Sequence, residues 1–165
     1  MAIQSNTEWK TESAFLAIMA AWTDLATITG NDATAITFRR WQDLSQTVTY
    51  PCVIVDAQSM GNEPFGNITG YDQVEVEIEC LTARWDDTTG QLLSNIMGAV
   101  RDMLRDDDIY VDLTAAVNEF NVYGIDFTQP SYREMSADVR RGTFNLTVHA
   151  TSSNVDNSSS STSSG

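Results

Sequence analysis

Basic residues are scarce in this sequence. Its 165 residues contain nine lysines and arginines against 23 aspartates and glutamates, which gives a formal net charge of −14. Tight binding to nucleic-acid phosphates or to anionic lipid depends on clustered cations, so the composition argues against both activities. A surplus of acid is also what a plain solvated surface shows when repulsion keeps a protein soluble.

Recognisable catalytic motifs are missing as well. The sequence has no GxSxG, phosphate-binding loop, HExxH or dinucleotide-binding pattern. Its single histidine, His149, falls at an outward position of a predicted strand, which favours a surface residue over a general base. The run Asp106–Asp108 lacks the spacing of an EF-hand, so we predict no metal there. These absences favour a protein that is not an enzyme and that needs no cofactor or metal.

Cysteine and long apolar runs are also rare. Only Cys52 and Cys80 are present, both inside strand patterns and without a CxxC motif. We predict two buried thiols in a reducing compartment, and a disulfide stays open if their strands are neighbours. No apolar run approaches the roughly 18–20 residues that a membrane-spanning helix needs, so we expect no membrane contact.

The most regular pattern in the chain is the stretch Gln73–Ala83, which reads QVEVEIECLTA. Apolar and acidic residues alternate there with a period of two, which predicts a β-strand with one dry face and one acidic face. Such a one-sided pattern is typical of an antiparallel sheet that is covered on one side only. The dry face holds Val74, Val76, Ile78 and Cys80, and the acidic face holds Glu75, Glu77 and Glu79.

Two helices are predicted to cover the dry face, Ser5–Thr27 and Thr88–Arg105, because apolar residues recur in both at helical spacing. Each begins with a capping-box pattern, in which a Ser or Thr is followed three residues later by Glu or Gln. The two pairs are Ser5 with Glu8 and Thr88 with Gln91. The apolar face of the first helix would consist of Trp9, Phe15, Ile18, Met19, Trp22 and Ala26.

The remaining strands complete an α+β fold with the order α-β-β-β-α-β-β, an antiparallel-rich β-sheet with two α-helices packed on one face. We expect a single domain at 1–151 and a disordered serine-rich tail at 152–165, which cannot bury enough apolar surface to order. The other predicted segments are strands at Ala35–Arg40, Thr47–Ala57, Asn121–Gln129 and Ala137–Ala150, a loop at Gln58–Asp72, a helical turn at Asp112–Phe120 and a turn at Pro130–Ser136.

The last predicted strand has one irregularity. Val139 is out of phase with the apolar residues from Phe144 to Ala150, and Gly142 lies between them. A β-bulge adds one residue to a strand and reverses the side on which the following residues lie. We therefore predict a bulge at Gly142.

The order of these elements resembles the tail terminator and tail completion proteins of long-tailed bacteriophages. The resemblance covers about Thr7 to Ala150 and includes the strand YPCVIVDA at Tyr50–Ala57, the long loop, the alternating strand QVEVEIECLTAR and the amphipathic helix after it. That family has no invariant catalytic motif, so the resemblance rests on the layout of the chain.

The resemblance implies a homohexameric ring that caps the tail tube, stops its polymerisation and offers a surface to the head. Its partners would be further copies of itself, the tail tube protein and head–tail connector proteins, and DNA would only pass through. The protein would lie at the head-proximal end of the virion tail, and in the host cytoplasm during assembly. The alternatives are a head–tail connector or tube-like virion subunit, and a small intracellular protein-binding module unrelated to virions.

Several residues are candidates for contacts in such an assembly. Glu75, Glu77 and Glu79 either line a channel that repels DNA phosphates, or meet a neighbouring subunit, or form plain solvent surface. A ring closes through contacts between two different patches, and basic residues are natural partners for an acidic one. The candidate partner-contacting residues are Arg39, Arg40, Trp41, Phe65, Ile68 and Arg140.

Overall fold

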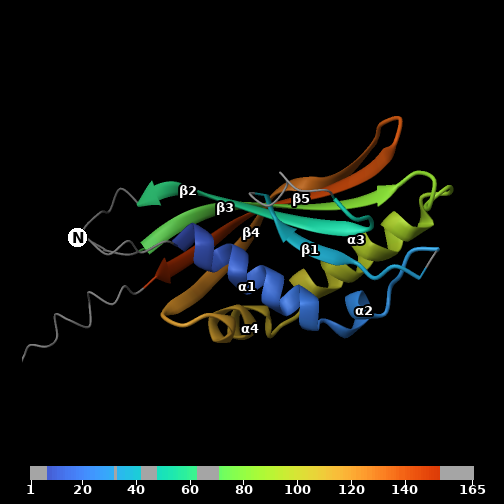
Figure 1. Ribbon diagram of the computed structural model, residues 1–165. Coiled ribbons are helices and arrows are strands. Elements are labelled where there is room, and N and C mark those ends of the chain that lie inside the picture. Colours follow the sequence, from blue (N-terminus) through green and yellow to red (C-terminus); the bar gives the residue numbers. More distant parts are fainter. Residues whose placement is uncertain (1–6, 32, 42–47, 63–70, 153–165) are drawn as a thin grey trace, which may run out of the picture.

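The structure is a computed structural model that describes residues 7–31, 33–41, 48–62 and 71–152. It is an α+β fold in which the helices lie on one side of a five-stranded sheet (Figure 1). The elements are α1 (Thr7–Ala21), α2 (Thr23–Ala26), β1 (Thr37–Arg40), β2 (Cys52–Asn62), β3 (Tyr71–Ala83), α3 (Gln91–Leu104), α4 (Ile109–Ala116), β4 (Phe120–Met135) and β5 (Val139–Ser152). The predicted fold class is confirmed.

The sheet has the strand order β1-β2-β3-β5-β4. β1 runs parallel to β2, and every other neighbouring pair is antiparallel. β3 lies in the middle and pairs with β2 on one edge and with β5 on the other. The alternation that predicted this strand is confirmed, because Val74, Val76, Ile78 and Cys80 are all buried.

The core lies between the sheet and the helices. α1 packs on β2, α3 packs on β3 and β5, and α4 packs on β4 and against α1. Large buried side chains from both layers meet there, and such burial stabilises the fold by about 1.5–3 kcal/mol for each aliphatic or aromatic side chain. They include Phe15, Met19, Ile78, Ile96, Met97, Leu113 and Leu146.

The first predicted helix is shorter and rotated relative to the prediction. α1 ends at Ala21, and Trp22 has the extended conformation φ −76°, ψ 119° before the short α2 begins. Phe15 and Met19 are in the core as expected, but Trp9 is 50% exposed. Glu12 is buried on this helix instead, for a reason given below. Ser5, the predicted capping residue, lies outside the described residues.

The second helix begins later than predicted and without the Thr88 capping box. α3 starts at Gln91, after Gly90, whose φ of +87° is a left-handed conformation that favours glycine. The carboxylate of Asp87 accepts hydrogen bonds from the N–H groups of Leu92 at 3.1 Å and Leu93 at 3.0 Å. Asp87 is therefore the residue that satisfies the free donors of the first turn.

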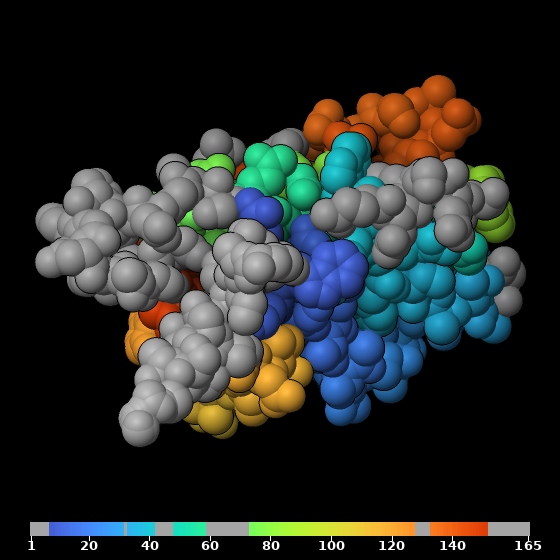
Figure 2. Space-filling model, turned by 60° about the vertical axis from the view of Figure 1, so that its left-hand side comes forward, coloured from blue at the N-terminus to red at the C-terminus, as the bar shows by residue number. Residues whose placement is uncertain are grey.

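β3 and β4 are longer than the sequence predicted, β2 and β5 have the predicted length but lie further along the chain, and β1 is shorter. β2 continues to Asn62 and β3 begins at Tyr71, so the loop predicted at Gln58–Asp72 is reduced to 63–70, which lies outside the described residues. β4 runs through the predicted Pro130–Ser136 turn as far as Met135. The β4–β5 hairpin therefore turns at 136–138 and stands out from the rest of the molecule (Figures 1 and 2). The serine-rich segment at 153–165 also lies outside the described residues.

The predicted bulge at Gly142 is wrong. β3 and β5 pair without a shift from Tyr71 opposite Thr151 to Ala83 opposite Val139. Val139 is in phase with the face of the sheet that points away from the helices, where it packs on Cys52, Ile54 and Leu81. The change of phase thus reflects a second, smaller apolar cluster on the other side of the sheet.

The same register places the two cysteines on opposite faces. Cys52 is opposite Leu81 in the β2–β3 ladder, whereas Cys80 is opposite Val53. Side chains of directly paired residues share a face, so the two sulfur atoms point to different sides of the sheet. Both thiols are free and buried, and burial raises the pKa of Cys52 to about 12. The prediction of two buried thiols is confirmed, and they do not form a disulfide.

Gly142 is required by helix packing. A Cβ at this position would lie 2.0 Å from the sulfur of Met97, which is buried in α3. We expect Gly142→Ala to lower the free energy of unfolding by about 1–3 kcal/mol, the usual cost of overpacking a core. In a Met97→Ala background the same substitution should cost much less, because the clashing atoms are gone. Urea unfolding of the four variants measures both costs, and equal costs in the two backgrounds would contradict this account.

Candidate interaction surfaces on the sheet and hairpin

The face of the sheet that points away from the helices, called here the outer face, has an apolar half and an acidic half. The apolar half is the cluster of Cys52, Ile54 and Leu81, against which Val48, Tyr50 and Val139 pack. The acidic half carries carboxylates from β2 and β3 and no helix covers it (Figure 1). The predicted acidic side of β3 therefore exists, but only part of it is open.

The open part forms a hollow of about 220 Å³, which we call the acidic hollow. It is built from neighbouring positions of three strands, because Asp56 of β2 is opposite Glu77 of β3, and Glu77 is opposite Asn145 of β5. Side chains at such directly paired positions lie close together, with Cβ atoms about 4.5–5.5 Å apart. The polar residues of the acidic hollow are Asp56, Gln58, Glu75, Glu77 and Asn145.

Two carboxylates of the acidic hollow, those of Asp56 and Glu77, are in an unfavourable electrostatic environment. Burial raises the pKa of Glu77, and the charges of Glu79 and Asp56 raise it further. Burial also raises the pKa of Asp56, with a second contribution from the charge of Glu8, while a hydrogen bond from the side chain of Gln58 opposes the rise. The only described cation that lowers the pKa of Glu77 is Arg141. The charged forms are therefore destabilised by partial loss of water and by mutual repulsion.

Glu79 differs from its neighbours because it is paired within the chain. Its carboxylate lies 3.6 Å from Nη1 of Arg141, whose same nitrogen is 3.7 Å from the carboxylate of Glu134. Burial still raises the pKa of Glu79, against the attraction of Arg141. Of the three glutamates predicted as channel lining or interface, Glu75 and Glu77 thus belong to the acidic hollow and Glu79 to an intrachain ion-pair network.

The raised pKa values give stability a defined pH dependence. A carboxyl group whose pKa is higher in the folded protein than in the unfolded one favours folding below its unfolded pKa, and this contribution is lost as the pH rises through its folded pKa. Melting temperature should therefore rise as the pH falls from 7 towards 5. Glu77→Gln should raise the melting temperature at pH 7 by a few degrees at most, because partly solvated charges are worth under about 1 kcal/mol each.

The stabilisation by Glu77→Gln should shrink as the pH falls and disappear below about pH 4, where the carboxyl group becomes protonated in both states. Glu75→Gln removes the same formal charge from an exposed position of the same strand and should change the melting temperature less. Calorimetric scans between pH 4 and 8 measure all three proteins. A Glu77→Gln variant that is less stable than the wild type at pH 7 would show that the charge of Glu77 is compensated.

Arg40, a predicted contact residue, belongs to the interior. Its guanidinium lies over the ring of Trp9, 3.4 Å from the centroid, and it donates a hydrogen bond to the hydroxyl of Ser13. Its Nε atom is 3.6 Å from Oε1 of Glu12, whose side chain is 1% exposed. Arg40 is itself buried, so the prediction that it contacts another subunit does not hold.

Glu12 also completes the edge of β2. β1 ends at Arg40, which is opposite Val55, and the Oε2 atom of Glu12 accepts a hydrogen bond from the N–H of Ala57 at 2.9 Å. The carboxylate thus satisfies a backbone donor just beyond the last residue of β1. Burial raises the pKa of Glu12, while the Ala57 N–H and Arg40 oppose that rise.

Removing one member of a buried ion pair leaves the other charge uncompensated. We expect Glu12→Ala to lower the free energy of unfolding by about 3–5 kcal/mol, the range found for such pairs. Glu12→Gln keeps an acceptor for the Ala57 N–H and should cost less than Glu12→Ala. Guanidinium unfolding of the two variants measures both values, and a loss within about 0.5 kcal/mol for Glu12→Ala would identify the pair as a surface feature.

The other predicted contact residues are more scattered. Arg39 is half-buried on the outer face, opposite Ile54, and Trp41 is exposed directly after β1. Phe65 and Ile68 lie outside the described residues. Arg140 lies beside the first turn of α3, where its Nε donates to the carbonyl of Asp87 at 2.7 Å and its Nη2 to that of Thr88 at 2.9 Å.

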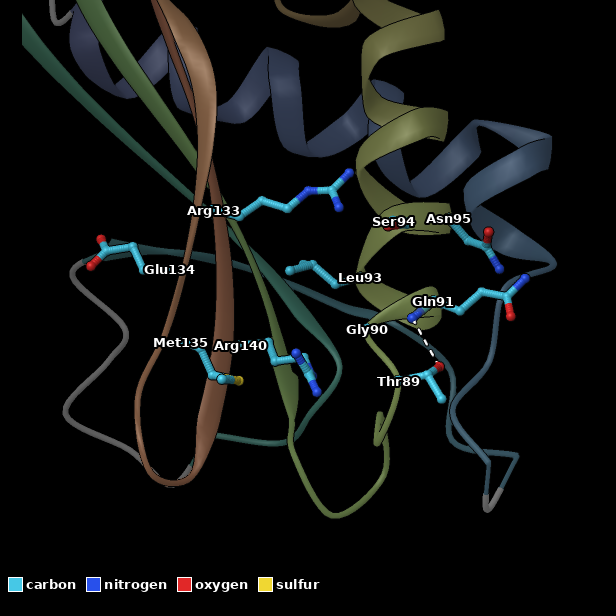
Figure 3. A pocket seen from close by; sticks show the side chains of 10 residues that line it. All are labelled: Thr89, Gly90, Gln91, Leu93, Ser94, Asn95, Arg133, Glu134, Met135 and Arg140. Atoms are coloured by element: carbon cyan, nitrogen blue, oxygen red, sulfur yellow. Dashed lines mark hydrogen bonds between the residues drawn. The ribbon is translucent and has the colours of Figure 1, made fainter.

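Arginines gather around the β4–β5 hairpin. Four of the nine basic residues of the chain lie at the end of the hairpin or against its turn, and we call this group the cationic hairpin end. It comprises Arg84, Arg133, Arg140 and Arg141. Between the hairpin and the start of α3 lies an open groove of about 650 Å³ (Figure 3). The groove is lined by Thr89, Gly90, Gln91, Leu93, Ser94, Asn95, Arg133, Glu134, Met135 and Arg140.

Three of these arginines have partners in the chain. Arg84 donates to the carbonyls of Ser136 at 3.3 Å and Ala137 at 3.1 Å, and thereby holds the hairpin turn. Arg140 and Arg141 make the contacts described above. Arg133 extends from β4 towards the groove (Figure 3), and its guanidinium makes no ion pair with the described residues. Sequence reasoning named only Arg140, although the close spacing of arginines at 133–141 in so acidic a chain was a usable signal.

The described residues give little support for a metal site, a catalytic histidine or a membrane-spanning helix. The structure contains, in the part that it describes, no group of three or more His, Cys, Asp or Glu side chains that could hold a metal ion. His149 lies with its Nε2 atom 2.9 Å from a carboxylate oxygen of Asp126 on the neighbouring strand, as a surface pair. None of the helices described is both long and apolar enough to cross a bilayer.

No protein-family model matches this chain, and no curated protein matches it at a significant level. The argument for a function therefore rests on the fold, the acidic hollow and the cationic hairpin end.

Proposed function

We propose that this chain is a structural virion protein, the terminator of a long bacteriophage tail. Copies of it form a ring that caps the tail tube, stops tube polymerisation and offers a joining surface to the head. The observation that carries the proposal is the order α-α-β-β-β-α-α-β-β, which is the predicted order with the short helices α2 and α4 added, together with the placement of all described helices on one side of a single sheet and an outer face that is acidic over one half. This is the layout in which the sequence resembles tail terminators.

The charge of the chain is consistent with this function. Every copy contributes a formal charge of −14, so a ring of several copies carries a strongly negative surface. DNA that passes through such a ring meets repulsion instead of binding, which is a useful property for a passage that must not retain it. Its partners are then copies of itself, the tail tube protein and a head–tail connector, and its place is the head-proximal end of the tail.

The exposed apolar residues offer area for protein contacts. Trp85 is 70% exposed beside the start of α3, Met135 is 56% exposed in the hairpin, and Trp41 is 52% exposed after β1. Aromatic side chains, methionine and arginine are enriched in protein–protein interfaces. A small domain with these residues at its periphery is suited to contacts with several neighbours at once.

Oligomeric mass and particle shape test the proposal. We expect light scattering to give about six times the chain mass of 18.2 kDa, and negative-stain microscopy to show closed rings. Added to purified tail tubes, the protein should bind at one end only and halt tube growth. A protein that stacks into tubes of its own would be a tube-like subunit. A protein that stays monomeric and ignores tubes would be a binding module of another kind, and either result would overturn the proposal.

A further inference from the structure

Two surfaces of opposite charge lie apart on the same molecule. The acidic hollow is on the outer face of the sheet, whereas Arg133, Met135 and Arg140 lie on the helix side of the hairpin. Arg133 is opposite Gly142, and Met135 is opposite Arg140. Gly142 and Arg140 are both in phase with the core-facing residues of β5. Along β3, Arg140 is opposite Thr82, and Glu77 is five residues away. Arg133 is opposite Gly142, which is opposite Cys80, so it is three residues, or about 10 Å, along the strand direction from Glu77. It also lies on the other face of the sheet and therefore does not reach the acidic hollow of its own chain.

Both surfaces carry charges that the described part of the chain does not fully compensate. The carboxylates of Asp56 and Glu77 are partly buried and repel each other, and the one described cation that acts on Glu77, Arg141, is already shared by Glu79 and Glu134. At the other surface, Arg133 is the member of the cationic hairpin end without an ion pair or hydrogen bond to the described residues. A guanidinium could compensate the charges of Asp56 and Glu77, since its planar donors can contact two carboxylates together.

We propose that the hairpin end of one copy docks on the outer face of the next, with Arg133 entering the acidic hollow against Asp56, Glu75 and Glu77. The contact joins two different patches and is therefore heterologous, the type that closes a ring or extends a filament. It deepens the proposed function and rests on it, because a terminator ring needs a contact of this type. Each copy still offers a free hairpin and a free hollow until the ring is closed.

The shape and surroundings of both surfaces suit this contact. The hairpin projects from the body of the molecule (Figures 1 and 2), and the acidic hollow is an indentation of about 220 Å³. Met135 is exposed beside Arg133 on the helix side of the hairpin. Its burial would add apolar contact area around a central charged anchor, an arrangement that is common at the energetically important part of interfaces.

Charge reversal on each side tests the contact. Arg133→Glu and Glu75→Arg each place like charges in it, and both positions are exposed, so the fold should survive. Arg105→Glu, at the exposed end of α3, is a matched control with the same change of charge as Arg133→Glu. Analytical ultracentrifugation at tens of micromolar and physiological salt measures self-association, and circular dichroism verifies folding.

We expect the wild type and Arg105→Glu to associate equally, and each of the other two variants to associate at least tenfold more weakly. A mixture of Arg133→Glu with Glu75→Arg should regain association, because each copy then offers the other an intact or a doubly reversed contact. If the variants failed to associate only because they were less stable, mixing them would not restore association.

The outcomes separate this contact from the proposed function. Rings that persist in both reversal variants would overturn the contact and leave the terminator function standing. Association that is lost on reversal and regained in the mixture, but that yields filaments or dimers without rings, would support the contact and overturn the terminator. A wild type that is monomeric under all these conditions, with or without tail tubes, would overturn both.

Discussion

The central strand β3 is the constraint on which the rest of this structure depends. It is hydrogen-bonded on both edges, and from Val74 to Cys80 its residues alternate between a dry face and an acidic one. A strand of this kind can exist only if helices cover the dry side, because Val74, Val76, Ile78 and Cys80 must leave water together. α1 and α3 meet that need, and the acidic side is left for water or for a partner.

The sequence was sufficient to predict the parts of the fold that depend on hydrophobic period. The alternation in β3 and the helical spacing in α3 each repeat over many residues, so both elements and their order were predictable. The parts that failed depend on single tertiary contacts. Asp87 replaces Thr88 as the helix cap because the β3–α3 turn brings its carboxylate to the first N–H groups. Trp9 is half-exposed instead of lying in the core, and the guanidinium of Arg40 lies over its ring.

The same distinction applies to the candidate surfaces. The row of glutamates in β3 was visible from the period alone, but its division into an acidic hollow and an intrachain network depends on where β5 places Arg141. Arg40 was predicted to contact a partner because a charged strand end usually faces water. Only the position of α1 shows that Arg40 is paired with Glu12 inside the chain. The cationic hairpin end was missed because Pro130 indicated a turn, whereas β4 passes through that residue near an irregularity in its register.

The irregular register of β4 makes this edge of the sheet a poor template for another strand. β4 is an edge strand of 16 residues, and an edge of that length normally invites pairing with another chain. Its register shifts at three places, between Val122 and Gly124, between Phe127 and Gln129, and between Gln129 and Tyr132. Bulges of this kind disrupt the regular row of donors and acceptors that a new strand would need. Extension of the sheet by a strand added along β4 is thereby discouraged.

Binding of a cationic partner explains the acidic hollow better than a contribution to stability does. Glutamine or threonine at position 77 would suit a half-buried strand position, and would avoid both the repulsion from Asp56 and the loss of water around the charge. Solubility does not require a carboxylate there either, since the chain already has a charge of −14. Proteins tend to keep locally unfavourable groups where a partner or ligand compensates them. Two adjacent, partly buried carboxylates on an otherwise uncovered sheet face meet that description, and a cation from a neighbouring molecule would remove the cost that the isolated chain retains.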